Sequence, residues 1–175
     1  MDFIQRHPLE DLMPTPAPAS LRDGDHMSIL RRPAVLSIIA APEALSALPD
    51  GVLRICGPFE CLLVLNETEL DAVTAELKNA GVPWVDQSHA SVVARLSGPN
   101  ARAVLAKGTA VDLHPAVFSI NQSTNTLYGQ VRINLARIAD DVFELVVPRS
   151  YARFFFEDIL QAGRSFSLTA AFAQA

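Results

Sequence analysis

The stretch with the clearest fold signal runs from residue 127 to residue 147 and reads Leu-Tyr-Gly-Gln-Val-Arg-Ile-Asn-Leu-Ala-Arg-Ile-Ala-Asp-Asp-Val-Phe-Glu-Leu-Val-Val. Its first nine residues alternate, which predicts one long strand from Leu127 to Leu135 with odd-numbered and even-numbered side chains on opposite faces. Ala139-Asp140-Asp141 predicts a turn into a second strand at 142–147. We interpret Asp140-Asp141 as solvated turn residues, because acid–base carboxylates need a buried cleft.

Further strands and helices flank this pair. Apolar and β-branched residues bounded by proline and glycine predict strands at 35–39, 52–56, 61–65 and 92–96. Helical spacing between capping residues and glycine or proline stops predicts helices at 42–48, 68–80, 99–108 and 150–163. The order β-α-β-β-α therefore occurs twice. It predicts an α+β fold of two small antiparallel or mixed sheets, with helices packed on one face of each.

The two repeats predict a first α+β subdomain at 29–84 and a second at 85–175, which share a core. Residues 1–28 form a separate N-terminal arm with four prolines, Pro8, Pro14, Pro16 and Pro18. Proline at this density favours extended chain. Apolar residues in the arm include Phe3, Ile4, Leu9, Leu12 and Met13. We expect it to order against a partner or its own domain, with a purely disordered tail as the alternative.

The composition is that of a globular protein. Of the 175 residues, 50% are hydrophobic and 19% are charged. The net charge of −5 argues against bulk attraction to nucleic acid or an anionic membrane. The longest mostly apolar run, 34–41, is far shorter than the roughly 20 residues of a membrane span. We expect a soluble cytoplasmic chain that binds neither nucleic acid nor membrane.

No motif predicts a catalytic, cofactor-binding or metal-binding residue. The four histidines and two cysteines lack the spacing of a zinc site. Glycine-rich phosphate loops are absent. We interpret Asp86-Gln87-Ser88-His89 as a turn whose side chains bond nearby backbone, because triads assemble from distant segments. We interpret Gly98-Pro99 as a tight turn rather than an anion site.

The last predicted helix contains Tyr151 and three consecutive phenylalanines, Phe154, Phe155 and Phe156. Three successive residues spread over roughly 200° of a helix, wider than a single buried stripe of about 100°. At least one ring is therefore expected at or outside the rim of the core. An exposed aromatic is typical of a protein–protein contact. We predict a partner interface that contains these four aromatic residues, with Arg95 and Arg132 as polar partners on exposed strand faces.

Several segments together resemble a known family. Residues 85–102, Val-Asp-Gln-Ser-His-Ala-Ser-Val-Val-Ala-Arg-Leu-Ser-Gly-Pro-Asn-Ala-Arg, resemble the Asp-x-Ser-His…Ser-Gly-Pro-x-Ala motif of folate-dependent aminomethyltransferase-like proteins. The continuation is similar to the gamma subunit of heterotetrameric sarcosine oxidase at 104–108, 111–115, 126–127, 140–145 and 148–152. The hairpin at 54–65 is similar too. The likeness covers about residues 30–163 and is most specific at 85–115.

The resemblance implies a subunit of an oxidoreductase complex that oxidatively demethylates sarcosine. It implies an aminomethyltransferase folate-binding-domain-like fold and a non-catalytic chain that packs against the large alpha subunit, with beta and delta subunits in the same complex. The FAD, FMN, NAD, tetrahydrofolate and zinc of such complexes are expected on other subunits, and this chain is expected to bind none. The methylglutamate dehydrogenase complex has a similar small subunit, which is an alternative.

One departure from the transferases bears on activity. They place an Asp-Asp pair near the start of the long strand, where an acid serves folate chemistry. Here that strand begins Thr126-Leu127-Tyr128-Gly129-Gln130, and Gln130 cannot carry a negative charge. We therefore expect no folate-dependent transfer by this chain alone. A stand-alone folate-binding protein and a self-associating scaffold are the alternatives.

Overall fold

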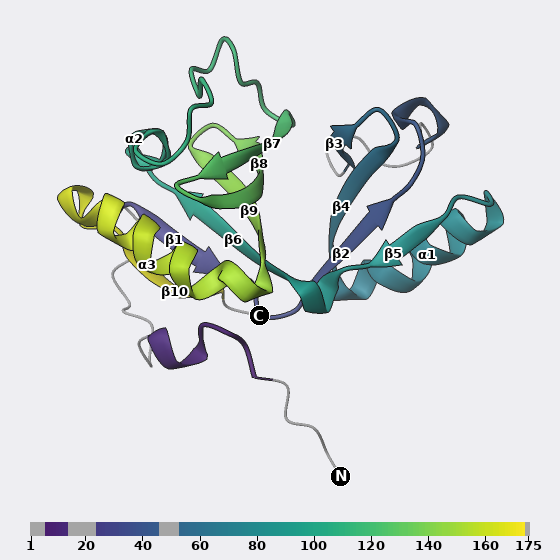
Figure 1. Cartoon of the computed structure of the whole chain (residues 1–175), viewed down its shortest axis with the longest axis horizontal. Helices are drawn as coiled ribbons and strands as arrows, with labels where there is room; N and C mark the ends of the chain where they lie inside the picture. The colour runs from purple at the N-terminus through teal and green to yellow at the C-terminus, as the bar shows by residue number, and fades with distance from the viewer. Residues whose placement is uncertain (1–5, 14–23, 46–52, 174–175) are drawn as a thin grey trace.

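The computed structural model describes residues 6–13, 24–45 and 53–173. These residues form two β-sheets with helices on their outer sides (Figure 1). The strands are β1 (His26–Ile29), β2 (Pro33–Ile38), β3 (Leu53–Gly57), β4 (Glu60–Asn66), β5 (Trp84–Asp86), β6 (Ser91–Ser97), β7 (Ser123–Tyr128), β8 (Val131–Ala139), β9 (Val142–Pro148) and β10 (Thr169–Phe172). The helices are α1 (Leu70–Asn79), α2 (Ala101–Ala106) and α3 (Ala152–Gly163). Short 3-10 helices are η1 (Glu10–Leu12), η2 (Pro42–Leu45), η3 (Glu67–Glu69), η4 (Ser88–Ala90), η5 (Arg149–Tyr151) and η6 (Arg164–Phe166).

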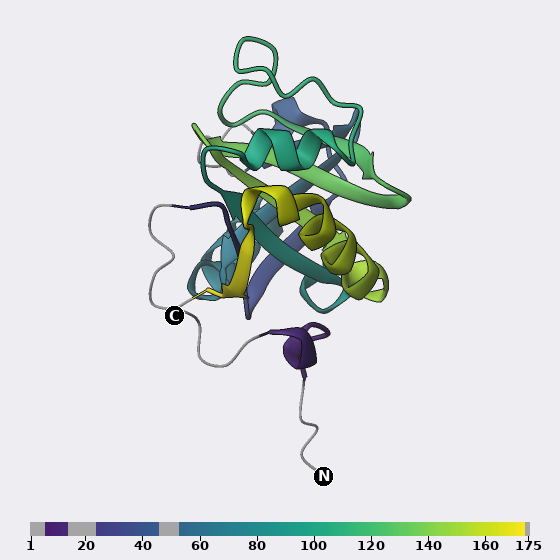
Figure 2. The ribbon, with the colours of Figure 1, turned by 90° about the vertical axis from the view of Figure 1, so that its left-hand side faces the viewer.

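The predicted α+β class is confirmed. The larger sheet has the strand order β10-β1-β6-β9-β8-β7 and is mixed, since β1 and β10 are parallel. The smaller sheet, β3-β4-β2-β5, is antiparallel. In each sheet a helix connects hairpin strands to a strand on the far side, the split β-α-β arrangement. Figure 2 shows α2 and α3 on the same face of the larger sheet.

The core has three parts. α2 and α3 bury residues such as Leu105 and Ile159 against the larger sheet. α1 buries Leu77 against the smaller sheet. A third cluster, Val35, Val93 and Val146, joins the inner faces of the two sheets. Each such side chain contributes about 1.5–3 kcal/mol on burial, so the inter-sheet contact is part of the fold's stability.

The prediction of one long strand over 127–135 is wrong. The chain reverses at Gly129-Gln130, between β7 and β8, and Tyr128 pairs with Val131. Gly129 has φ 56°, a conformation that glycine adopts at low cost in hairpin turns. The strict alternation continues through the turn, so the pattern of apolar residues alone hides the reversal. As a result Tyr128 and Val131 are cross-strand neighbours that are both buried, at 1% and 2% exposed, whereas one continuous strand would place them on opposite faces.

Two short strands, β1 and β5, cross the predicted limits of the subdomains. β1 covers residues 26–29, mostly inside the predicted arm, and pairs with β6 and β10 of the larger sheet. β5 spans the 84/85 limit and pairs with β2 of the smaller sheet. Both strands are short, and their sequences carry too few alternating residues to signal a strand. Part of the predicted helix at 42–48 appears as η2, and its residues 46–48 lie outside the described residues.

Residues 6–13 of the predicted arm pack on the chain's own fold. Leu9 and Met13 are 1% and 8% exposed and belong to the core of the larger sheet. Arg149 donates a hydrogen bond from Nη2 to the carbonyl oxygen of Arg6 at 2.6 Å. Phe3, Ile4 and the prolines at 14, 16 and 18 lie outside the described residues.

The residues that carry the family resemblance have structural roles. Asn100 donates from its backbone N–H and its side-chain amide to the buried carboxylate of Asp25, each at 2.8 Å. Gly98, at φ 124°, lies so close to Asp25 that a Cβ would be 2.6 Å from its Oδ1. Asp25 thus occupies the turn before α2, where an external anion was the alternative. The tight-turn interpretation is the one observed.

The Asp86–His89 segment is also a turn. The backbone N–H of Ser88 donates to Asp86 Oδ1 at 2.8 Å. Ser88 Oγ accepts a hydrogen bond from the backbone N–H of Val35 at 3.0 Å. Both side chains therefore bond backbone, Asp86 within the turn and Ser88 across to β2.

Candidate functional site

The start of α3 presents two exposed aromatic rings. Tyr151 is 58% exposed and Phe154 is 55% exposed. Three residues apart, they lie on one side of the helical turn, while the 100° step carries Phe155 and Phe156 to the sheet. The expectation that at least one of the three phenylalanines lies outside the core is thus met by Phe154.

Phe155 and Phe156 do not lie on a surface that a partner could contact. They are 3% and 2% exposed and belong to the core of the larger sheet. Phe155 packs edge-on against Tyr128, with ring centroids 5.3 Å apart. The prediction that Phe155 and Phe156 belong to the partner interface is therefore wrong. A helix that packs on a sheet buries the side chains on the face toward the sheet.

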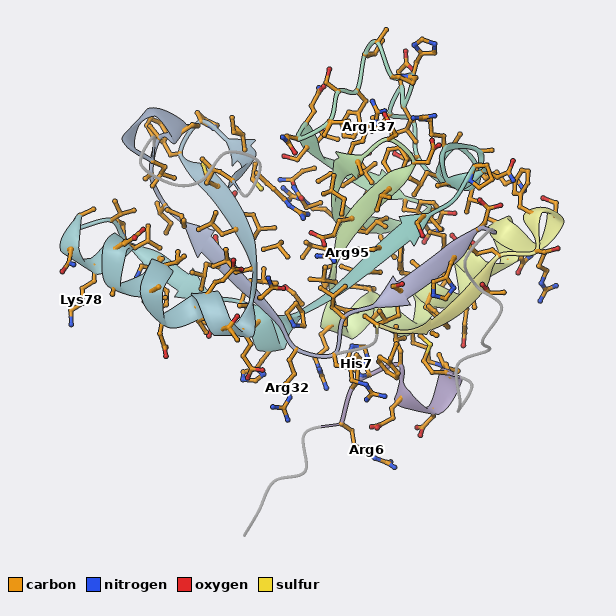
Figure 3. The ribbon with its side chains drawn as sticks, turned by 180° about the vertical axis from the view of Figure 1, so that it is seen from behind. Arg6, His7, Arg32, Lys78, Arg95 and Arg137 are labelled. Carbon is orange, nitrogen blue, oxygen red and sulfur yellow. The ribbon has the colours of Figure 1, made fainter. Side chains whose placement is uncertain are left out.

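The two arginines of the predicted interface have different surroundings. Arg132 is exposed on β8, opposite the exposed Leu127 of β7. Arg95, on β6, has 46% of its side chain exposed, but its Nε lies 2.5 Å from Oε2 of the buried Glu144. Arg95 therefore already has a partner inside the chain, and Figure 3 shows it between the two sheets.

A buried ion pair joins the sheets. Arg54 of β3 and Glu144 of β9 are 5% and 3% exposed, and Nη2 of Arg54 donates to Oε1 of Glu144. With Arg95 on Oε2, both carboxylate oxygens of Glu144 accept from a guanidinium. Burial lowers the pKa of Arg54, and the charge of Glu144 acts in the opposite direction. Arg54 and Glu144 thus form an ionic cross-link between the sheets.

Amide side chains extend this cluster. Arg54 Nη1 donates to Asn134 Oδ1 at 3.1 Å, and Asn134 Nδ2 donates to Asn125 Oδ1 at 3.0 Å. Asn125 Nδ2 donates to the carbonyl oxygen of Cys56 at 3.3 Å. Burial, and next the charge of Glu60, raises the pKa of the Cys56 thiol, which favours the thiol over the nucleophilic thiolate. The cluster is therefore suited to joining β3 to β7 and β8 rather than to nucleophilic chemistry.

Sequence reasoning missed this cluster. A signal for it exists: Arg54 and Glu144 are opposite charges in the middle of short apolar strands, where an unpaired charge is costly to bury. The sequence does not show that the two strands face each other from different sheets. Gln130, by contrast, is exposed at the β7–β8 turn.

The described residues form neither a metal-ligand cluster nor a membrane-spanning helix. Across residues 6–13, 24–45 and 53–173, no three His, Cys, Asp or Glu side chains gather as metal ligands. In the same ranges no helix is both long enough and apolar enough to cross a membrane. Asp140 and Asp141 lie at the tip between β8 and β9, where they pair with Arg137 and Arg102 at 3.0 Å each.

Comparison with known proteins places the chain in a family. The model described as "Sarcosine oxidase, gamma subunit family" matches residues 23–164. A chain in the structure of heterotetrameric sarcosine oxidase from Corynebacterium sp. U-96 in complex with pyrrole 2-carboxylate is similar, with a TM-score of 0.75 and 25% identity. That similarity covers 93% of this chain and 96% of the other.

A second solved structure shares the fold. The glycine cleavage system aminomethyltransferase T from Bartonella henselae aligns with a TM-score of 0.62 and 20% identity, over 86% of this chain and 48% of the transferase. Comparison with curated protein sequences gives no significant match. The family match covers most of the chain, and this chain therefore belongs to the sarcosine oxidase gamma subunit family.

Proposed function

We propose that this chain is the non-catalytic gamma-type subunit of a heterotetrameric oxidoreductase that oxidatively demethylates sarcosine. It packs against the large alpha subunit, in a complex that also contains beta and delta subunits. The observation that carries this proposal is the near end-to-end similarity to a chain of the Corynebacterium enzyme, at 93% and 96% coverage. FAD, FMN, NAD, tetrahydrofolate and zinc belong to the other subunits, and this chain binds none of them.

The side chains present support a non-catalytic role. The buried acidic side chains of the described residues are Asp25 and Glu144. All four of their carboxylate oxygens accept hydrogen bonds from within the chain. A general base needs a carboxylate that can reach substrate with its proton-accepting oxygen free. The aminomethyltransferases that this chain resembles were expected to have an Asp-Asp pair near this part of the chain. Here the β7–β8 turn contains Gln130, which is neutral and exposed.

The surface at the start of α3 is the contact that we propose for the alpha subunit. Tyr151 and Phe154 together supply exposed aromatic area, the residue type enriched in interface cores. Arg153 lies between them in sequence and pairs with Glu157 at 3.0 Å. The rings are therefore flanked by charge, as in an interface with an apolar centre and a polar rim.

Co-purification tests the proposal. The tagged full-length chain, expressed in its native host, should recover larger flavin-bearing chains with sarcosine oxidase activity. Recovery of the chain alone, or as a homo-oligomer by light scattering, would contradict the proposal. If the recovered complex oxidised methylglutamate and not sarcosine, the chain would be the small subunit of a methylglutamate dehydrogenase.

Tetrahydrofolate binding separates a stand-alone folate protein from a structural subunit. The purified chain should show no saturable binding of tetrahydrofolate by calorimetry. Tight binding that Gln130→Ala weakens would favour the folate-binding alternative. This alternative is tested because the chain shares its fold with the Bartonella transferase.

A further inference from the structure

A half-open cavity of about 480 Å³ lies where residues 6–10, the β1–β2 turn and the β5–β6 connection meet. Four arginines line it from three separate parts of the chain: Arg6, Arg31, Arg32 and Arg149. Figure 3 shows Arg6, His7 and Arg32 at the same end of the molecule. Its lining does not include Glu144 or its partners, but it does include Asp86, Ser88 and His89 of the turn after β5.

The cavity is more basic than the chain as a whole. Three carboxylates, those of Glu10, Glu67 and Asp86, also line it. With neutral histidines its formal charge is therefore +1, in a chain whose net charge is −5. Burial first, and then the charges of Arg149 and Arg31, lower the pKa of His7 to about 4. A positive field therefore acts on the ring of His7 at the cavity wall.

The arginines are only loosely engaged by the chain's own acids. Arg6 lies 4.0 Å from Glu10 and Arg32 lies 3.9 Å from Glu67, with 72% and 80% of the arginine side chains exposed. Such exposed pairs contribute little to stability, so a carboxylate from outside can replace them at low cost. Arg31 Cζ lies 4.1 Å from the centroid of the Phe172 ring, a cation–π contact.

We propose that this cavity is the docking site for an acidic segment of a partner polypeptide, whose Asp or Glu carboxylates pair with Arg6, Arg32 and Arg149. This inference rests on the proposed function, since it assigns the segment to another subunit of the complex. Arginines on separate segments suit carboxylates that are spaced along a chain. A small free anion is held instead by buried, convergent donors, and both Arg6 and Arg32 are largely exposed.

The cavity also adjoins the proposed aromatic contact. η4, at the cavity wall, contacts η5, which begins with Arg149 and ends with the exposed Tyr151. Pro33, Ala34 and Leu70 give the cavity some apolar lining. One partner could thus cover the aromatic rings and extend an acidic segment into the cavity.

Binding of a fluorescein-labelled octaglutamate peptide to the chain tests the inference, measured by fluorescence anisotropy at 50 and 300 mM NaCl. Arg32→Glu should weaken binding at least tenfold, and Glu67→Gln should tighten it. Both side chains are exposed, so neither change should disturb the fold. Arg132→Glu makes the same charge change on an exposed arginine outside the cavity and should alter affinity less than twofold.

Three results would overturn the inference. The first is no saturable binding at 50 mM NaCl. The second is an equal loss in Arg132→Glu, which indicates only general charge attraction. The third is inorganic phosphate competing as well as the peptide, which indicates a free-anion site. Co-purification of the unmodified chain with the other subunits of the complex does not depend on the peptide experiment. The proposed function can therefore stand if the cavity proposal fails.

Discussion

Gly98 and Glu144 are each so closely surrounded that the loss of stability on substitution can be predicted. Gly98 combines a positive φ of 124° with the absence of space for a Cβ. Glu144 combines burial with two guanidinium partners. In both cases the constraint comes from a segment far away in sequence, Asp25 for the first and Arg54 for the second.

Gly98→Ala should destabilise the protein by about 3 kcal/mol or more, because backbone strain and a clash with Asp25 add. Gly81→Ala is the matched control. Gly81 also has a positive φ, 67°, but nothing lies within 4 Å of the position of its Cβ. That control should cost about 1 kcal/mol. Urea unfolding measures both, and equal losses would show that the contact with Asp25 does not matter.

Glu144→Gln should lower the free energy of unfolding by about 3–5 kcal/mol, because Arg54 would remain charged and buried without its anion. The double variant Arg54→Met with Glu144→Leu removes both charges and should recover most of that loss. Urea unfolding of the single and double variants measures the coupling. If the double variant lost as much free energy of unfolding as the Arg54→Met and Glu144→Leu single variants lose together, the ion pair would not be the reason for the loss.

At the scale of elements, the segment that contains η1 is held by two core side chains and by His7. Leu9 and Met13 insert into the core, and the backbone N–H of Leu9 donates to Nδ1 of His7 at 3.2 Å. The His7 ring packs edge-on against Phe172 with centroids 5.0 Å apart. Protonation of Nδ1 would remove this acceptor, so docking of the arm depends on a neutral His7.

This dependence predicts a loss of stability in mild acid. The pKa of His7 is lowered to about 4 from 6.5, so between these values the unfolded chain binds a proton that the folded chain does not. Stability from His7 is therefore complete above about pH 6.5 and falls as the pH decreases toward 4.

Urea unfolding at pH 7, 5.5 and 4.5 measures this effect. His7→Asn keeps a hydrogen-bond acceptor without the titration, so it should lose less stability than the wild type between pH 7 and 4.5. His89→Asn, a change at an exposed histidine, should retain the wild-type profile. Identical profiles for all three proteins would rule out His7 as the source.

At the scale of the whole molecule, the proposed interface predicts how the complex forms. Tyr151→Ala and Phe154→Ala should each weaken assembly with the partner subunits tenfold or more, because truncation of a hot-spot aromatic costs about 2 kcal/mol or more and about 1.4 kcal/mol is tenfold in affinity. Phe59→Ala is the matched control. Phe59 is 68% exposed at the β3–β4 hairpin and should leave assembly unchanged.

Titration of the tagged chain into the remaining subunits, followed by size-exclusion chromatography, measures this difference. Equal effects of Phe59→Ala and Phe154→Ala would place the interface elsewhere. Circular dichroism of each variant checks that the fold is retained, as expected for side chains that are more than half exposed.

Local signals in the sequence were sufficient for the α+β class, the helix α1, the turns at Asp86–Ser88 and Gly98–Asn100, the exposure of one phenylalanine of α3 and the family. Each depends on residues within one or two turns of chain, where spacing determines the face. The pairing of β1 and β5 with their sheets, the Arg54–Glu144 pair and the arginine cavity were decided only in three dimensions. They join segments up to 143 residues apart, as between Arg6 and Arg149, and such pairings depend on the packing of the whole chain rather than on any local pattern.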